Sequence, residues 1–295
     1  MIHSIVEQIG NTPLIHLREI TRDLPSQVKV YAKAEFFNPG GSVKDRPAYR
    51  MIQEGIRSGE LTKEKIIMDP TSGNTGVAYS MIGASLGYQV ELVVPENVSQ
   101  QRKDMALSFG AKLTYSSAME GSDGAILLAR KMKEENPDKY FMPDQYNNPF
   151  NPQAHYDTTG VEIYEQTQQK VTHFVAGIGT TGTIMGVGRR LKDYNRDIQC
   201  FASEPAEALH GLEGLKHMPS SIVPGIYHPE ELDGVISVNT EDGYDIAERL
   251  AKEEGLFVGH SSGSNVWTAL EVAKGLKEGV VVTILCDNGD RYIPI

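Results

Sequence analysis

Cysteines and metal-ligand patterns are nearly missing from this sequence. Only two cysteines, Cys200 and Cys286, occur among 295 residues, and they lie far apart and outside any C-x-x-C pair. The eight histidines are scattered, and none belongs to an H-E-x-x-H run. These spacings exclude the usual zinc sites and a disulfide framework. A chain of this length buries enough apolar surface to fold without either, so we predict no metal site.

Basic charge and long apolar runs are also scarce. The chain has 28 Lys and Arg against 39 Asp and Glu, a formal net charge of -11. Such an excess of negative charge opposes a phosphate backbone, so nucleic acid is not an expected partner. The first residues lack a basic region followed by a long apolar core, and no stretch is long and apolar enough for a membrane span. We expect a cytoplasmic protein without a membrane partner.

An alternation of short apolar runs and helix-like stretches fills most of the chain. The runs predict strands at residues 65–69, 90–95, 112–115, 173–176, 199–202 and 280–285, with helices between most of them. This alternation is typical of α/β domains in which helices cover both faces of a parallel sheet. A Pro- and Asn-rich stretch at residues 147–152 predicts the break between two domains, residues 1–145 and 146–295.

The segment NPGGSVKDR, residues 38–46, holds one lysine in a turn-forming sequence that leads into a helical pattern. Pro39 and Pro47 flank Lys44 and restrict the backbone there. A lysine amine held unprotonated in a pocket forms an imine with an aldehyde. Lys44 is therefore a candidate catalytic residue, and the alternative is an ordinary surface lysine in a glycine-rich turn.

The segment TSGNTG, residues 71–76, directly follows a predicted strand. Glycines let a ligand approach the backbone, and the free amides at the start of the next helix attract an anion. The hydroxyl groups and the Asn74 amide add donors that suit a carboxylate. The alternative is that these residues only cap the helix.

The segment GIGTTGT, residues 177–183, follows the strand predicted at 173–176. Its backbone amides and three threonine hydroxyl groups suit a phosphate group. It also matches the dinucleotide fingerprint G-x-G-x-x-G, and Glu204 lies about twenty residues further on, so an NAD-dependent dehydrogenase is an alternative. The short fingerprint arises easily by chance, and the many hydroxyl groups favour a single phosphate over a pyrophosphate.

The segment GHSSGS, residues 259–264, places His260 next to two serines at the start of a predicted helix. Adjacent residues usually point apart, and the spacing differs from the G-x-S-x-G elbow of serine hydrolases. Helix capping is therefore favoured over a nucleophilic serine.

Together, and in this order along the chain, the four segments resemble the pyridoxal-phosphate β-family of fold type II, and within it the B-type cysteine synthases, or O-acetylserine sulfhydrylases. The resemblance extends from residues 9–14 to residues 289–292. It implies two three-layer α/β domains on parallel sheets, similar to the tryptophan synthase β subunit, with pyridoxal 5'-phosphate between them. It further implies a mobile part at about residues 76–131 that closes over the substrate, and packing of roughly the first 35 residues on the other domain.

The resemblance also implies a role for each candidate site residue. Lys44 would hold the cofactor as an imine and then act as general base on the α-proton. Asn74 would contact the ring hydroxyl oxygen, and Ser261 the ring nitrogen. The phosphate would lie on Gly179, Thr180, Thr181, Gly182 and Thr183, and the substrate's α-carboxylate on Thr71, Ser72, Asn74, Thr75 and Gln145.

The implied reaction is a β-replacement that forms L-cysteine from O-acetyl-L-serine and sulfide through an aminoacrylate intermediate. Thr181 stands where many relatives have glycine, which favours the B-type branch. Lys216 lies where some B-type enzymes carry a basic residue that selects O-phosphoserine, and the alternative is a solvated lysine. Those enzymes can take sulfur from a carrier-protein thiocarboxylate.

Cystathionine β-synthase and serine or threonine dehydratases share the cofactor residues, so they stay open as alternatives. The implied protein partners are a second copy of the chain, a sulfur-carrier protein and serine acetyltransferase.

Overall fold

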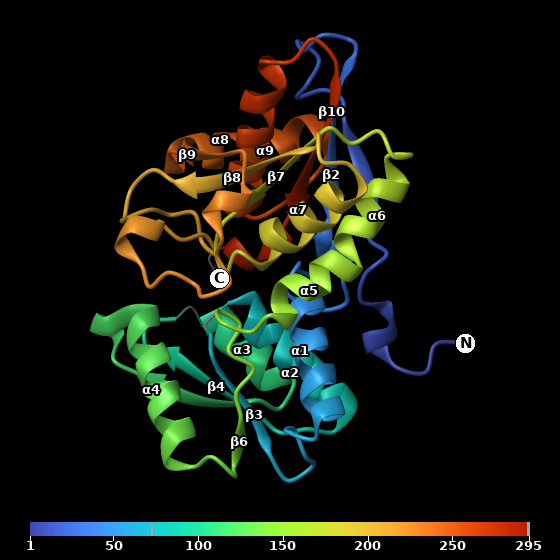
Figure 1. The fold of residues 1–295 in the computed structure, drawn as a ribbon. Helices are drawn as coiled ribbons and strands as arrows, with labels where there is room; N and C mark the ends of the chain where they lie inside the picture. Colours follow the sequence, from blue (N-terminus) through green and yellow to red (C-terminus); the bar gives the residue numbers. More distant parts are fainter. Residues whose placement is uncertain (72, 99, 294–295) are drawn as a thin grey trace. The chain divides into compact units, whose positions relative to one another are not determined.

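The computed structural model describes residues 1–71, 73–98 and 100–293 (Figure 1). The chain divides into two compact units. Among the described residues, the first unit consists of Met1–Ile9 and Lys44–Asn151, and the second of Gly10–Val43 and residues 152–293. The second unit therefore combines an early segment of the chain with the C-terminal half.

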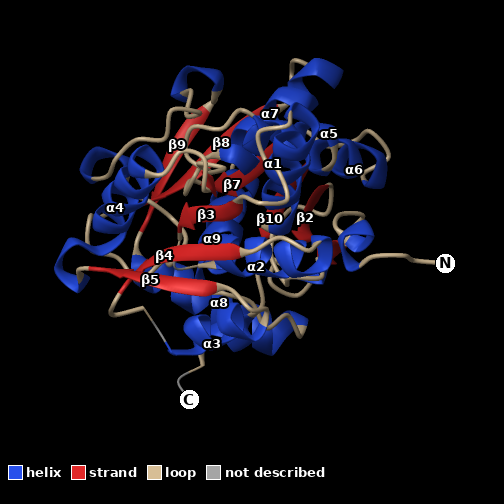
Figure 2. Ribbon diagram, turned by 90° about the horizontal axis from the view of Figure 1, so that it is seen from below, coloured by secondary structure: helices blue, strands red, loops and turns tan. Residues whose placement is uncertain are grey.

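The first unit is built on a parallel four-stranded sheet with the order β5-β4-β3-β6. Figure 2 shows β5, β4 and β3 side by side. The strands are β3 (Ile66–Pro70), β4 (Val90–Pro95), β5 (Lys112–Ser116) and β6 (Tyr140–Phe141), and the helices are α1 (Asp45–Ser58), α2 (Asn74–Leu86), α3 (Gln100–Ser108) and α4 (Gly121–Glu135).

Alternate residues of the central strands face two separate cores. Ile67 and Leu92 pack in a cluster with α1, α2 and α3. Their neighbours Met68 and Val93 pack in a second cluster with Ala125 and other residues of α4. Because successive side chains of a strand point to opposite faces, helices cover both faces of this sheet.

The second unit is built on a six-stranded sheet with the order β1-β2-β10-β7-β8-β9, parallel except for the antiparallel pair β1 and β2. Its strands are β1 (Leu14–Leu17), β2 (Val28–Ala34), β7 (His173–Gly177), β8 (Gln199–Pro205), β9 (Gly234–Val238) and β10 (Gly279–Leu285). The helices are α5 (Phe150–Asp157), α6 (Thr159–Gln166), α7 (Gly182–Tyr194), α8 (Thr240–Glu254) and α9 (His260–Lys274). Short 3-10 helices lie at Ile5–Gln8, Glu35–Phe37, Ala118–Glu120, Met218–Ser220, Pro229–Glu231 and Gly289–Tyr292.

This sheet also has a core on each face. Val282 of β10 packs in a cluster with Ile163 of α6 and Ile184 of α7. Val281, the preceding residue, packs in a different cluster with Leu250 of α8 and Ala269 of α9. Two units of three layers on mainly parallel sheets confirm the predicted fold class.

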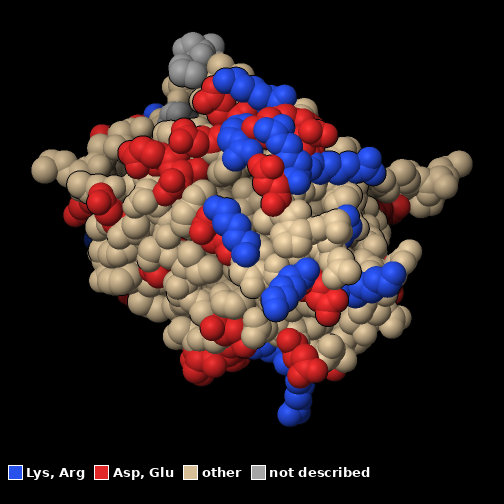
Figure 3. Space-filling view, turned by 90° about the horizontal axis from the view of Figure 1, so that it is seen from above, with Lys and Arg blue, Asp and Glu red and all other residues tan. Residues whose placement is uncertain are grey.

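The surface carries charge of both signs. In the view of Figure 3, lysines and arginines lie beside aspartates and glutamates, without a large area of basic charge alone. Exposed helical pairs such as Arg249 with Glu253 are of the kind that contributes little to stability. Among the described helices, none has both the length and the apolar character that a membrane crossing requires.

Candidate active site

The predicted carboxylate loop follows β3 and leads into α2. Its start is fixed by the backbone of Thr71, whose amide donates to the Val93 carbonyl at 3.1 Å. Asn74 is the first residue of α2, and Thr75 is buried behind it. Ser72, also predicted in this loop, lies outside the described residues. The loop therefore presents its polar groups at the carboxyl end of a parallel strand, which is where α/β sheets bind ligands.

Two predicted substrate residues that lie far apart in the sequence meet in the first unit. The Thr75 hydroxyl donates to Oε1 of Gln145 at 2.8 Å. Both side chains are 4% exposed. The Gln145 carbonyl in turn accepts from the Asn151 amide at 2.7 Å, which fixes the segment that carries Gln145. The contact brings Thr75 and Gln145 together on this unit, and it uses the Gln145 amide oxygen, so that the amide nitrogen is the group that can donate to a ligand.

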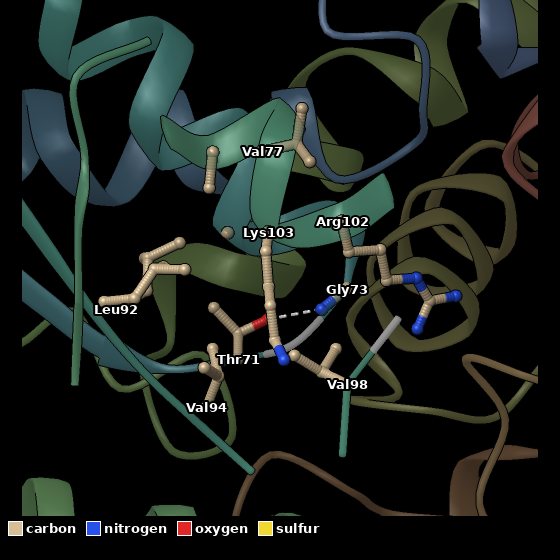
Figure 4. A pocket seen from close by; sticks show the side chains of 11 residues that line it. Thr71, Gly73, Val77, Leu92, Val94, Val98, Arg102 and Lys103 are labelled. Carbon is tan, nitrogen blue, oxygen red and sulfur yellow. Dashed lines mark hydrogen bonds between the residues drawn. The ribbon is translucent and has the colours of Figure 1, made fainter. Parts of the chain in front are cut away.

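A small cavity separates the carboxylate loop from the helix α3 (Figure 4). Thr71, Gly73, Val77, Leu92 and further, mainly apolar residues line it. Its volume is about 10 Å³, about the smallest space that holds one water molecule. The Gly73 amide donates to the Thr71 hydroxyl at 3.4 Å across the turn. This space is too small for a substrate.

Lys44 lies immediately before α1, as the first residue of the longer segment of the first unit, and is partly buried. The residue after it, Asp45, is fully buried. The preceding turn is held by Asn38, whose Nδ2 donates to the carbonyl and to Oε2 of Glu35, both at 2.9 Å. Gly41 has φ of 77°, in the left-handed region that favours glycine, and its amide donates to the Asn38 carbonyl at 2.7 Å. The turn-rich sequence thus forms the rigid turn that its residues predict.

The predicted phosphate loop of the second unit connects β7 to α7. Thr181 caps α7 with φ of 71°, although it is not a glycine, and it is 2% exposed. Its hydroxyl has no hydrogen-bond partner among the described residues. A Cβ on Gly179 would lie 2.2 Å from the carbonyl oxygen of Gly214, so close packing requires glycine there. A buried, unpaired hydroxyl beside a helix N-terminus fits the phosphate group of a cofactor.

A histidine that belongs to none of the four segments adjoins this loop. His155 of α5 is 1% exposed. Its Nδ1 lies 2.9 Å from the Thr159 hydroxyl, and its Nε2 lies 3.3 Å from the hydroxyl of Thr183, the last predicted phosphate residue. A lone histidine after an Asn-Pro break carries no pattern that reveals this contact. His155 therefore orients the Thr183 hydroxyl from behind the loop.

Lys216 lies next to the same loop. Its backbone amide donates to the Ile178 carbonyl at 2.8 Å. The side chain of Leu215 packs against Gly177 so closely that a Cβ there would lie 2.5 Å from it. The segment that carries Lys216 is therefore fixed along the predicted phosphate loop.

Ser261 lies in the first turn of α9 and is 4% exposed. The next residue, Ser262, accepts from the Cys286 amide at 2.8 Å and so has a structural role. The His260 ring packs between Tyr244 and Tyr292, at centroid distances of 4.0 and 5.3 Å, and burial lowers its pKa. His260 is thus a packed aromatic ring, which disfavours a Ser-His nucleophile at this turn.

Two other candidate ligand sites, one for a dinucleotide and one for a metal ion, are made of residues with other interactions. The Glu204 carboxylate, which a dinucleotide fingerprint would use for a ribose, accepts from the Met218 amide at 2.7 Å. His228, Glu230 and Glu231 bring metal-ligating atoms within 4.8 Å of one another. Arg189, however, binds both carboxylate oxygens of Glu231, at 2.7 and 2.9 Å. This surface group is an ion-pair network.

The chain matches the family model described as pyridoxal-phosphate dependent enzyme over residues 5–287. It therefore belongs to the pyridoxal-phosphate dependent enzymes, as the four segments indicated. That family membership excludes the dehydrogenase and serine hydrolase alternatives.

Comparison with individual proteins narrows the family. The chain is 50% identical to a cysteine synthase of Aquifex aeolicus, covering 98% of this chain and 90% of the relative. It is 40% identical to cysteine synthase B of Salmonella typhimurium, covering 99% and 95%. A crystal structure of cysteine synthase (OASS) from Entamoeba histolytica matches with a TM-score of 0.95 at 35% identity, covering 99% of this chain and 89% of that one. Within the family, the chain belongs to the cysteine synthases.

Proposed function

We propose that this enzyme forms L-cysteine from O-acetyl-L-serine and sulfide by replacement at the β-carbon. The observation that carries the proposal is the Thr75–Gln145 hydrogen bond, which brings two predicted carboxylate ligands together beside the start of α2. Supporting it are the buried, unpaired Thr181 hydroxyl in the phosphate loop and the similarity to cysteine synthases.

In this proposal the chain's own residues hold and orient the cofactor. Lys44 would bind it covalently, the turn at residues 179–183 would bind its phosphate, Asn74 its ring hydroxyl oxygen and Ser261 its ring nitrogen. A neutral hydroxyl is a weaker partner for a ring nitrogen than a carboxylate, which favours elimination over full carbanion chemistry. When bound, pyridoxal phosphate supplies an electron sink for the α-carbon of an amino acid.

The remaining residues act on the substrate. Thr71, Ser72, Asn74, Thr75 and Gln145 would bind its α-carboxylate, by hydroxyl and amide donors and by the amides at the start of α2. Lys44, once released from the cofactor, would take the α-proton with its amine. Acetate then leaves the β-carbon and sulfide takes its place. We propose that a part of the first unit at about residues 76–131 closes and excludes water during these steps.

The proposal also specifies the leaving group of the substrate and the sulfur donor. Lys216 lies beside the phosphate loop, so a second candidate substrate is O-phospho-L-serine, with Lys216 binding its phosphate. A carrier-protein thiocarboxylate is then the alternative sulfur donor. Serine acetyltransferase and a second copy of the chain are the proposed protein partners. We place the reaction in the cytoplasm, where Cys200 and Cys286 stay in the thiol form.

The test supplies the purified enzyme with sulfide and with O-acetyl-L-serine, O-phospho-L-serine or L-serine in turn, and measures L-cysteine. We expect O-acetyl-L-serine to give the highest kcat/KM, and Lys216→Ala to leave that value unchanged. If only O-phospho-L-serine reacts, and Lys216→Ala abolishes the reaction, the acetyl assignment is wrong. Release of pyruvate and ammonia without cysteine would instead favour a dehydratase.

A further inference from the structure

A buried carboxylic acid adjoins the predicted carboxylate loop. Asp69 is the fourth residue of β3, two residues before Thr71, and its side chain is fully buried. Tyr79 of α2 is also fully buried. Within the described residues, neither oxygen of the Asp69 carboxyl nor the Tyr79 hydroxyl has a hydrogen bond of good geometry. Burial without such partners disfavours the ionised form of a carboxyl group.

The groups that act on Asp69 come from α2 and from the segment that follows β6. Burial raises its pKa to about 8, and the charge of Asp144 adds to this effect. The Tyr79 hydroxyl and the backbone amides of Asp144 and Gln145 approach closely enough to lower the pKa, but they do not offset burial. Tyr146 faces the same region, with a pKa raised by burial and by Asp69, Asp123 of α4 and Asp144. None of these groups is a cation, and the donors among them stabilise a charge on Asp69 by less than burial opposes it.

The same residues connect Asp69 to the predicted substrate site. The backbone amide of Gln145 approaches the Asp69 carboxyl, while the side-chain oxygen of Gln145 accepts from the Thr75 hydroxyl at 2.8 Å. On the other side, Asp69 is joined to Thr71 through Pro70 alone. A negative charge on Asp69 would therefore oppose a second carboxylate held by Thr71, Thr75 and Gln145, because like charges in a buried region repel strongly.

We propose that Asp69 stays protonated and couples this proton to binding of the substrate's α-carboxylate. The inference rests on the proposed function, since it takes the loop from Thr71 to Thr75 as the carboxylate site. Asp69 does not touch the substrate in this account and is a positioning residue. By reciprocity, the bound carboxylate also holds the proton on Asp69 more tightly.

The test compares the wild-type holoenzyme with Asp69→Asn and Tyr79→Phe. L-serine is titrated into each from pH 6.5 to pH 9.5, and binding is followed by the visible absorbance of the cofactor. Asparagine has the shape of the neutral acid and cannot ionise. The titration of L-serine itself affects both proteins equally, so it cancels in the ratio of the wild-type Kd to the Asp69→Asn Kd. We expect this ratio to be constant at low pH and to rise about five- to tenfold by pH 9.5.

The Tyr79→Phe variant makes the test specific and does not depend on the folding of Asp69→Asn. It removes a hydroxyl that favours the ionised carboxyl, so the rise in Kd should move to higher pH than in the wild type. A structural role for Tyr79 alone would leave the midpoint unchanged. A constant Kd ratio over the whole range, or an unmoved midpoint in Tyr79→Phe, overturns the proposal. Failure of the proposed function looks different: all three proteins retain cofactor but none binds L-serine at any pH, and the proposal falls with it.

Discussion

Replacing Asp69 by asparagine should remove much of the pH dependence of the protein's stability between pH 5 and pH 8. The carboxyl has an ordinary pKa of 3.8 in the unfolded chain and about 8 in the folded protein. Because the folded state keeps a proton that the unfolded state has lost, this contribution is complete below pH 3.8 and is lost as the pH rises through 8. One pKa unit corresponds to about 1.4 kcal/mol, so the wild type should lose about 4 kcal/mol over these three pH units.

The assay is urea unfolding at pH 5, 6, 7 and 8, followed by circular dichroism, with the same saturating cofactor concentration for every protein. The free energy of unfolding of Asp69→Asn, relative to the wild type, should increase by about 4 kcal/mol from pH 5 to pH 8, whatever its value at pH 5. Asp144→Asn is the matched control, because it removes a carboxylate from a partly exposed site nearby and should keep most of the wild-type decline. Parallel curves for the wild type and Asp69→Asn would refute the idea of a buried neutral acid.

Three further substitutions test the site itself. Thr75→Val removes the hydroxyl that donates to Gln145. We expect KM for the amino acid to rise about tenfold, which corresponds to the loss of about 1.4 kcal/mol of binding free energy, with a smaller change in kcat. An unchanged KM would show that Thr75 does not contribute to substrate binding. Gly179→Ala places a Cβ 2.2 Å from the Gly214 carbonyl oxygen, so it should lower the free energy of unfolding by about 1–3 kcal/mol and weaken cofactor binding. The control is Gly275→Ala, whose Cβ would lie 3.5 Å from its nearest neighbour and which should change neither the free energy of unfolding nor cofactor binding. Thr181→Val keeps the shape and removes the unpaired hydroxyl, so the Kd for pyridoxal phosphate in equilibrium dialysis should rise about tenfold, and an unchanged Kd would exclude Thr181 from phosphate binding.

The sequence predicts the central strands well because they are continuous apolar runs. The strand predicted at 90–95 coincides with β4, and that at 280–285 lies within β10 (Gly279–Leu285). The strands β1, β2, β6 and β9 were not predicted. A strand of two residues, a partly exposed edge strand or an alternating strand such as Val28–Ala34 gives no such run. Pairing of β2 with β10 joins residues about 250 positions apart, and no local pattern encodes such a contact.

The site shows the same division between local and long-range information. The turns at the starts of α2, α7 and α9, which carry Asn74, Thr181 and Ser261, are local sequences, so their composition predicts them. Asp69 gives no such signal, because an acidic residue near a strand end is ordinary until its burial is known. The contact of His155 with Thr183 depends on how α5 packs on α7, where a Cβ on Gly186 would lie 2.1 Å from the Pro152 carbonyl oxygen.

The central claim is that Lys44 is the residue that holds the cofactor. The most direct measurement reduces the holoenzyme with borohydride, which fixes the cofactor permanently to its lysine, and then maps the modified peptide by mass spectrometry. We expect one pyridoxyl group per chain, on Lys44, and no labelling of a Lys44→Ala variant treated in the same way. A pyridoxyl group on another lysine of the wild type, with Lys44 unmodified, would contradict it.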